Sequence, residues 1–296
     1  MRGAKPKGTI RIGISGWTYP PWRGRFYPDG LPHRSELAYA ARRFASIEIN
    51  GTFYRLQRPE HFARWFDETP HDFVFAVKGP RYLTHMLKLW NAQSPLANFF
   101  ASGLLRLGAK LGPILWQFPE RMRFDEARFE TFLSLLPRNT KEALALARKH
   151  DARLDGRSFL SIDRSRPLRH AVEIRSESFC NERFVRLLRR HRVALVVADT
   201  VDWPLKMDVT TGFVYCRLHG SKELYASGYG PHALETWARR VKAWARGSEP
   251  RDAVCIGAAA RPRANGRDVY VYFDNDAKVR APRDARALSR LLGVIP

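Results

Sequence analysis

Short apolar runs alternate with amphipathic stretches along all 296 residues. Eight of these runs are rich in Val, Ile, Phe and Tyr and are bounded by Gly, Pro, Asn or Asp, which is the pattern of β-strands. The predicted strands are Ile10–Ser15, Ser46–Asn50, Asp72–Lys78, Pro113–Phe118, His170–Arg175, Val193–Asp199, Gly212–His219 and Asp268–Asp274.

Helical spacing of apolar residues fills most of the gaps between these strands. Several of the helical stretches start with a Ser cap or with Pro in the first turn. The predicted helices are Ser35–Phe44, Pro59–Phe66, Ser94–Leu107, Glu126–Leu136, Thr140–Arg148, Asn181–His191, Pro231–Ala245 and Pro282–Leu292. The stretch Thr200–Thr211, after the sixth strand, has the composition of a loop.

Eight strands that alternate with helices predict an α/β fold, a single (β/α)8 TIM barrel that is irregular after the sixth strand. Two smaller doubly wound domains are the alternative arrangement. No linker rich in Pro, Gly and Ser divides the chain, which favours one domain over residues 1–296. A polar, basic insertion is expected around residues 138–169.

Polar residues concentrate on one face of each predicted strand, because side chains two residues apart share a face. The other face is apolar, as at Ile12 and Ile14. We expect the polar face to line the barrel and open at the C-terminal mouth, where TIM-barrel enzymes have their active sites. On the sixth strand this assigns Leu195, Val197 and Asp199 to the inside. The charged and polar side chains predicted to converge at the mouth are Glu48, Lys78, Gln117, Glu173, Arg175, Asp199, Arg217, His219 and Asp274.

These charged groups also allow a structural interpretation. Glu48, Glu173, Arg175 and Arg217 can neutralise one another as a buried ion-pair network that fixes the barrel interior. Buried charge is costly to maintain, however, which favours a functional role for part of the set.

The loop after the first predicted strand, SGWTYPPWRGRFYP at residues 15–28, interleaves aromatic rings with Arg23 and Arg25. It is expected at the same mouth. Such rings can stack on bases or sugars. The alternative is that they pack together as a lid or a small core over the barrel.

The chain is strongly basic: 51 Lys and Arg residues against 29 Asp and Glu give a net charge of +22. Such a field attracts polyanions, including nucleic acid, ribosomes, anionic membranes and phosphorylated metabolites. Basic clusters lie at Arg157–Arg169, Arg186–Arg192 and Arg261–Arg267. An arginine-rich coding bias that spreads solvated charge over the surface is the alternative.

Several classes of protein are disfavoured. Cys180, Cys216 and Cys255 form no CxxC pair, so a zinc ribbon, a thioredoxin-type site and a disulfide framework are not expected. The chain has no GxGxxG, GxxxxGK[ST] or HExxH motif and no nucleophile elbow, hence no nucleotide cofactor motif. No targeting or membrane-spanning segment is found, so a cytoplasmic location without membrane association is expected.

Eight segments together resemble a known family, in order and in spacing, over nearly the whole chain. They are SGWTYPPWRGRFYP, FASIEINGTFYRL, FAVKGPRYLTH, LGPILWQFP, HAVEIRSESF, LVVADT, VYCRLHGSKELYASGY and VYVYFDNDAKVRAP. The chain is similar to the YecE-like family, domain of unknown function 72 (DUF72).

The resemblance implies a TIM barrel without an established activity. The recurrent polar positions that it implies are Ser15, Trp17, Glu48, Asn50, Tyr54, Lys78, Gln117, Glu173, Arg175, Asp199, Arg217, His219, Tyr272, Asn275 and Asp276. Many members have His after the fifth-strand Arg, where this chain has Ser176.

The first functional hypothesis is an enzyme, a hydrolase or isomerase, that acts on an anionic or phosphorylated ligand. Lys78, Arg175, Arg217 and His219 would hold the anion. Glu48 or Glu173 would be the general base and His219 the general acid, with Asp199 as a further catalytic group. The remaining substrate-binding residues would be Ser15, Trp17, Asn50, Tyr54, Gln117, Tyr272, Asp274 and Asn275.

Two other hypotheses remain open. The side chains that suit a divalent metal ion, as in a metal-dependent hydrolase or nuclease, are Glu173, Asp199, His219 and Asp274. Arg175 and Arg217 in the same layer would repel the cation, so a metal cofactor is not favoured. The other hypothesis is a non-catalytic nucleic-acid-binding protein whose basic clusters give salt-dependent affinity.

Overall fold

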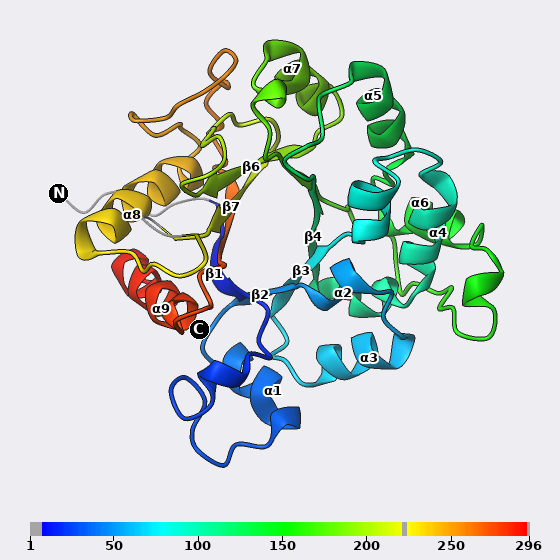
Figure 1. Ribbon diagram of the computed structural model, residues 1–296, viewed down its shortest axis with the longest axis horizontal. Helices are drawn as coiled ribbons and strands as arrows, with labels where there is room; N and C mark the ends of the chain where they lie inside the picture. Colours follow the sequence, from blue (N-terminus) through cyan, green and yellow to red (C-terminus); the bar gives the residue numbers. More distant parts are fainter. Residues whose placement is uncertain (1–7, 221–223, 295–296) are drawn as a thin grey trace.

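Eight parallel strands form a closed barrel in sequence order in the computed structural model, which describes residues 8–220 and 224–294. Figure 1 looks down this barrel, with the helices arranged around it. The strands are β1 (Ile10–Ser15), β2 (Ser46–Ile49), β3 (Val74–Lys78), β4 (Leu111–Gln117), β5 (His170–Glu173), β6 (Ala194–Asp199), β7 (Phe213–Leu218) and β8 (Asp268–Phe273). The predicted α/β TIM barrel and all eight predicted strands are confirmed.

The helices cover the outside of the barrel. They are α1 (Glu36–Ala41), α2 (Gly51–Tyr54), α3 (Pro59–Asp67), α4 (Gln93–Ala101), α5 (Glu126–Leu135), α6 (Thr140–Ala147), α7 (Glu182–Arg190), α8 (Pro231–Ala245) and α9 (Arg280–Leu292). Their starts follow local rules: the N-cap side chains of Asp125, Asn139 and Asn181 each accept a hydrogen bond from a backbone N–H in the first turn. The helix predicted in the basic segment 138–169 is therefore present as α6, whereas the single-domain boundary stays a prediction.

Two connections differ in detail from a regular alternation. The predicted helix Ser94–Leu107 is split, because Gly103 adopts a left-handed φ of 111° and a short 3-10 helix follows at Leu104–Lys110. A Cβ at Gly103 would collide with the backbone of Pro59 in α3, so glycine allows these two segments to pack closely. Between β6 and β7 the chain contains no helix, which confirms the predicted irregularity.

Apolar side chains form two layers. The larger lies between the strands and the helices and includes Ile12 and Ile14, as predicted. The smaller fills the barrel itself with Val74, Ala76, Leu115, Ala171, Ala194, Val196, Ala198, Phe213, Tyr215, Tyr270 and Tyr272. The predicted inward face is therefore wrong on β6, where Leu195 and Val197 pack in the outer layer. A strand that is apolar on both faces gives no parity signal in its sequence.

Among residues 8–220 and 224–294, no helix has both the length and the apolar character needed to cross a lipid bilayer.

Candidate functional site

The guanidinium of Arg217, on β7, lies at the centre of the polar end of the barrel and is fully buried. Its Nη2 donates to Glu48 Oε1 at 2.9 Å and to Asp274 Oδ2 at 2.8 Å, and its Nη1 donates to Glu173 Oε2 at 2.7 Å. Ser15 Oγ accepts a further hydrogen bond from Nη2 at 3.2 Å. The structure therefore brings together side chains from β1, β2, β5 and β7 and from Asp274 directly after β8, as their inward positions predicted.

Both oxygens of the Glu48 carboxylate are already occupied. Oε1 accepts hydrogen bonds from Ser15 and Arg217, and Oε2 accepts from the Tyr215 hydroxyl at 2.5 Å and from Arg217 Nε at 3.1 Å. One layer below, the Tyr272 and Ser46 hydroxyls lie 2.7 Å apart. Glu48 and Tyr272 are thus held inside the barrel. For Glu48 this agrees with the buried ion-pair network that is the alternative to a functional role.

Arg217 also controls the protonation of its partners. Burial alone would raise the pKa of Glu173, but the guanidinium groups of Arg217 and Arg175 outweigh it and hold this pKa well below its usual range. The same balance between burial and Arg217 depresses the pKa of Asp274. Both carboxylates are therefore ionised and weakly basic, which disfavours Glu173 as a general base.

His219 is enclosed beneath two aromatic side chains. Its ring makes edge-on contacts with Trp203 and Tyr225 at centroid distances of 5.3 and 5.4 Å, and the residue is fully buried. Its Nδ1 lies 3.1 Å from Asp274 Oδ2, yet neither ring nitrogen has an aligned hydrogen bond among the described residues. Trp203 and Tyr225 separate His219 from solvent in this arrangement.

Arg175 connects this aromatic cover to the charged network. Its Nε donates to Glu173 Oε1 at 2.9 Å, its Nη2 donates to the Tyr225 hydroxyl at 3.2 Å, and its guanidinium stacks 3.6 Å from the Trp203 ring centroid. The Trp203 indole N–H in turn donates to Glu120 at 2.8 Å. These three contacts orient Arg175, whose side chain is 12% exposed.

Lys78 is a second cation at the mouth, at the end of β3. Its ammonium lies 4.2 Å from the Phe53 ring centroid and, within the described part of the chain, has no carboxylate within 4.0 Å. Burial, reinforced by the charge of Arg217, lowers the pKa of Lys78 to about 8. Burial and the charge of Lys78 lower the pKa of nearby His85 to about 4, so that imidazole is neutral at pH 7. Gln117 Oε1 is buried and unpartnered within the described ranges.

Asp199 lies outside this constellation, and the prediction that it joins the others in the barrel is wrong. It ends β6 on the outward face, where its Oδ2 accepts a hydrogen bond of 2.9 Å from the Trp237 indole of α8. Burial raises its pKa. Asn275 is also turned away, since its Nδ2 donates to the Ser227 carbonyl and to Asp284 of α9, both at 2.9 Å.

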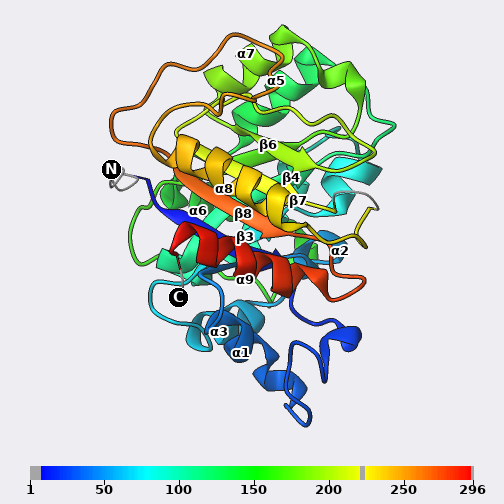
Figure 2. The ribbon, with the colours of Figure 1, turned by 90° about the vertical axis from the view of Figure 1, so that its left-hand side faces the viewer.

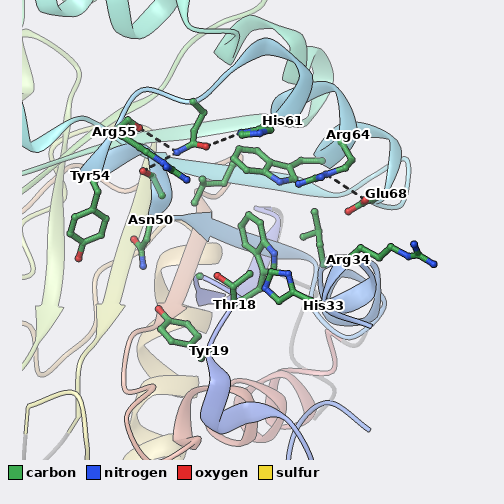
Figure 3. Close-up of a pocket in the computed structure, with 17 residues that line it drawn as sticks. Thr18, Tyr19, His33, Arg34, Asn50, Tyr54, Arg55, His61, Arg64 and Glu68 are labelled. Atoms are coloured by element: carbon green, nitrogen blue, oxygen red, sulfur yellow. Dashed lines mark hydrogen bonds and ion pairs between the residues drawn. The ribbon is translucent and has the colours of Figure 1, made fainter. Parts of the chain in front are cut away.

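A cavity of about 580 Å³ opens beside the mouth, between the β1 loop and helices α1 to α3 (Figure 3). In Figure 3, Asn50 lies between Tyr54 and Tyr19, and His33 and Arg34 face His61 and Arg64 across the space. The residues that line it are Gly16, Trp17, Thr18, Tyr19, His33, Arg34, Leu37, Ile49, Asn50, Gly51, Tyr54, Arg55, Gln57, His61, Arg64, Trp65 and Glu68. We call this cavity the aromatic pocket.

Trp17, Asn50 and Tyr54, all predicted as substrate-binding residues, line the aromatic pocket. Trp17 packs edge-on against Trp65 with centroids 5.5 Å apart, and Tyr54 is 69% exposed. Asn50 joins the pocket to the barrel network, because its Nδ2 donates to Ser15 Oγ at 3.1 Å. The pocket and the Arg217 network are therefore parts of one polar region.

The aromatic loop of residues 15–28 is packed into the protein in part and lines the aromatic pocket in part. Trp22 and Tyr27 are fully buried and pack with Phe26, which makes a small core. Trp17 and Tyr19 instead contribute to the wall of the aromatic pocket.

Asp276 and Tyr19 stand where the pocket meets the mouth. The Tyr19 hydroxyl donates to the Ser15 carbonyl at 2.7 Å and lies beside Asn50 and Asp276. Burial, reinforced by the charge of Asp274, raises the pKa of Asp276 to about 6. Asp276 is only partly buried, which makes it an accessible carboxyl whose protonation changes near neutral pH.

Comparison with known proteins agrees with this architecture. A family model described as "Protein of unknown function DUF72" matches residues 11–295. The chain belongs to the DUF72 family. This DUF72 chain is also 32% identical over 123 residues to the UPF0759 protein YecE of Escherichia coli K12, an alignment covering 37% of this chain and 43% of YecE. It is 26% identical over 115 residues to the UPF0759 protein YunF of Bacillus subtilis, covering 37% and 40% of the two chains. The aligned region thus spans less than half of either relative.

Solved structures show the same fold. A DUF72 family protein of Thermotoga maritima superposes with a TM-score of 0.71 at 23% identity, covering 96% of this chain and 99% of that one. A DUF72 family protein of Enterococcus faecalis superposes with a TM-score of 0.66 at 15% identity, covering 96% of each chain. At these identities the likeness extends to the barrel only.

The metal hypothesis finds no support in the geometry of this DUF72 protein. Within residues 8–220 and 224–294, no three His, Cys, Asp or Glu side chains are grouped so as to hold a metal ion. Of the four proposed ligands, Asp199 points away, and the Arg217 guanidinium occupies the space between Glu173 and Asp274.

Several residues of the DUF72 site carried no signal in the strand pattern. Trp203 and Tyr225 lie on loops and His85 lies in a short π-helix (Tyr82–Met86) after β3, where the alternation of strand residues says nothing about direction. Asp276 was identified through the family resemblance alone, and its raised pKa depends on a neighbour that only the fold supplies.

Proposed function

We propose that this DUF72 protein binds a small anionic ligand with a flat apolar part in the aromatic pocket and performs acid–base chemistry on it at the barrel mouth. The observation that carries the proposal is the lining of the aromatic pocket, where aromatic rings and arginines surround one cavity at the active-site end of a TIM barrel. Trp17, Trp65, Tyr19 and Tyr54 offer ring faces and edges to a planar group.

The charge balance of the pocket favours an anion. Three arginines and a single carboxylate line it, and that carboxylate, Glu68, already lies 3.7 Å from Arg64. Arg34 and Arg55 are left to bind a phosphate or carboxylate, for which the planar guanidinium is suited. This supports the anionic ligand expected from the sequence. The proposed anion contacts are then Arg34 and Arg55 of the aromatic pocket in place of Arg217.

The acid–base role falls to a different residue from those first considered. Glu48 and Glu173 are held by Arg217, and His219 is covered by Trp203. Asp276 is partly exposed, lies beside Tyr19 at the pocket edge and has a pKa of about 6, so it exchanges protons readily near neutral pH. A hydrolase or an isomerase would both use such a group.

Thermal unfolding in the presence of chosen probes tests the binding step. AMP carries both a ring and a phosphate, whereas adenosine and inorganic phosphate each carry one of them. We expect AMP to raise the Tm most, by about 5 °C at a hundred times its Kd, because ligand binding then adds about 2.7 kcal/mol. If AMP, adenosine and phosphate all leave the Tm unchanged, the proposed ligand class is wrong.

A matched pair of variants locates the site. Tyr54→Ala with Arg55→Ala removes an exposed ring and an exposed cation from the pocket, and should abolish the AMP shift. Arg81→Ala with Tyr82→Ala makes the same chemical change on an exposed segment outside the pocket and should retain it. Equal effects of the two pairs would place binding elsewhere.

A further inference from the structure

A second cavity, of about 890 Å³, lies at the opposite end of the barrel from the mouth. It surrounds the starts of β5, β6 and β7 and is lined by Arg138, Pro167, Leu168, Arg169, His170, Arg190, Arg192, Thr211, Gly212, Phe213 and Arg263. Figure 2 shows the loop before β8 (orange) on the side of the barrel from which β1 enters. We call this cavity the arginine basin.

The basin collects residues from all three basic clusters that the sequence contains. Arg169 belongs to Arg157–Arg169, Arg192 to Arg186–Arg192, and Arg263 to Arg261–Arg267. These segments are far apart along the chain, and the closed barrel brings them to one hollow. Five arginines line the basin and no acidic residue does. A surface made by coding bias alone would not gather them in one concave place.

Part of the basin is held in position by the protein. Arg169 spans the bottom of the barrel: its Nη1 donates to the Tyr270 hydroxyl at 2.6 Å and its Nη2 donates to Asp268 at 2.7 Å. Arg190 pairs with Glu130. Even with these two carboxylates counted, the five arginines leave an excess of positive charge.

Two arginines remain unengaged. Arg192 and Arg263 are exposed, and in the described part of the chain neither guanidinium has a hydrogen-bond or ion-pair partner. The Arg263 guanidinium lies against the bare backbone of Gly212, where a Cβ would collide with it. Their charge is therefore available to an anion that enters the basin.

We propose that the arginine basin binds the phosphate backbone of a nucleic acid. Arg192 and Arg263 present exposed guanidinium groups from two separate segments. These groups suit an extended chain of phosphates, which can contact each in turn and release counterions as it does so. The net charge of +22 would steer such a polyanion to the protein. A lipid surface fits less well, since Phe213 is buried and the lining offers a hollow in place of an apolar face.

Fluorescence anisotropy with a labelled 20-nucleotide RNA and a labelled DNA strand of the same length tests the proposal, at NaCl concentrations from 50 to 200 mM. We expect saturable binding at 50 mM that weakens steeply with salt. Arg192→Ala with Arg263→Ala should weaken binding at 50 mM by about tenfold or more and reduce the slope of log K against log salt by about 1.4, the amount for two phosphate contacts on a single strand.

The matched control is Arg121→Ala with Arg123→Ala. These two arginines are equally exposed, but they follow β4 and lie at the mouth end of the barrel. Affinity within twofold of the unchanged protein supports the basin. Equal loss in both variants, or no binding at 50 mM salt, overturns the proposal, as does binding to phosphatidylserine vesicles without binding to either strand. A failure here leaves the AMP result at the aromatic pocket unaffected.

Discussion

Replacement of the central guanidinium is the sharpest test of the barrel network. Arg217→Met keeps much of the side-chain volume but removes the cation that joins Glu48, Glu173 and Asp274. Breaking a buried ion pair by removal of one partner costs about 3–5 kcal/mol, because the remaining charge is left without compensation. For a chain of this size each kcal/mol lowers the Tm by about 2 °C, so the expected loss is about 6–10 °C at pH 7.

The loss should depend on pH in a defined direction. In the unchanged protein the pKa values of Glu173 and Asp274 are depressed, so their contribution to stability is present above the usual carboxyl range and is lost only as the pH falls well below it. Without the guanidinium, burial raises both pKa values and the network loses stability as the pH rises. The difference between Arg217→Met and the unchanged protein should therefore be larger at pH 7 than at pH 4.

Circular dichroism melts at the two pH values measure both effects. Arg263→Ala, on the exposed loop before β8, is the control and should change the Tm by less than about 1 °C. Adding Glu173→Gln to Arg217→Met should recover part of the loss, since it removes one of the uncompensated charges. If the Tm of Arg217→Met equals that of the control at both pH values, the network and the inward orientation of these side chains are refuted.

Three further predictions address single side chains. The pKa of Asp276 in the folded protein is raised to about 6. Its contribution to stability is therefore complete below the unfolded carboxyl pKa and is lost as the pH rises through 6. Asp276→Asn should raise the Tm at pH 7 and have little effect at pH 4 in thermal melts. In NMR spectra of protein with isotope-labelled lysine, Lys78 should titrate near pH 8. A Lys78 titration near the reference value for lysine, about 10.4, would contradict its burial beside Arg217. Asp199→Ala removes the acceptor of the Trp237 indole and should lower the free energy of unfolding in urea by about 1–2 kcal/mol. It should leave the AMP-induced Tm shift intact, and loss of that shift would show that Asp199 belongs to the site at the mouth.

The alternation of eight strands with helices predicted the barrel. On seven of the strands, an inward face that becomes polar toward its end predicted where the charged side chains converge. The partners in the Arg217 network follow from this inward face. Ser15, Glu48 and Glu173 occupy it on β1, β2 and β5, and Asp274 continues it directly after β8. What could not be predicted is which charged side chains pair with one another and which remain available to a ligand. Whether Glu48 faces a ligand or is saturated by Arg217 depends on atomic distances that spacing along a strand does not contain.

The wrong orientation predicted for β6 has a clear physical origin. β6 is apolar on both faces, so the polar residue Asp199 at its end was the only guide to which face points inward. In the structure Asp199 points outward, because the Trp237 indole of α8 donates a hydrogen bond to it outside the barrel. The positions of the loop residues at the site could not be predicted for a related reason. Trp203 and Tyr225 cover His219 through tertiary contacts between two loops, and loop sequence has no period from which direction can be read.

The seam of the barrel joins the first strand to the last. Ile10 to Ile14 pair with Val269 to Phe273, and the Trp22 indole donates to the Asp276 carbonyl across the same join. During synthesis one edge of β1 therefore stays without its partner until almost the entire polypeptide has left the ribosome. An open parallel sheet with two free edges invites association with other chains. Production of this protein in cells should accordingly benefit from slow translation or from chaperones that shield those edges until closure.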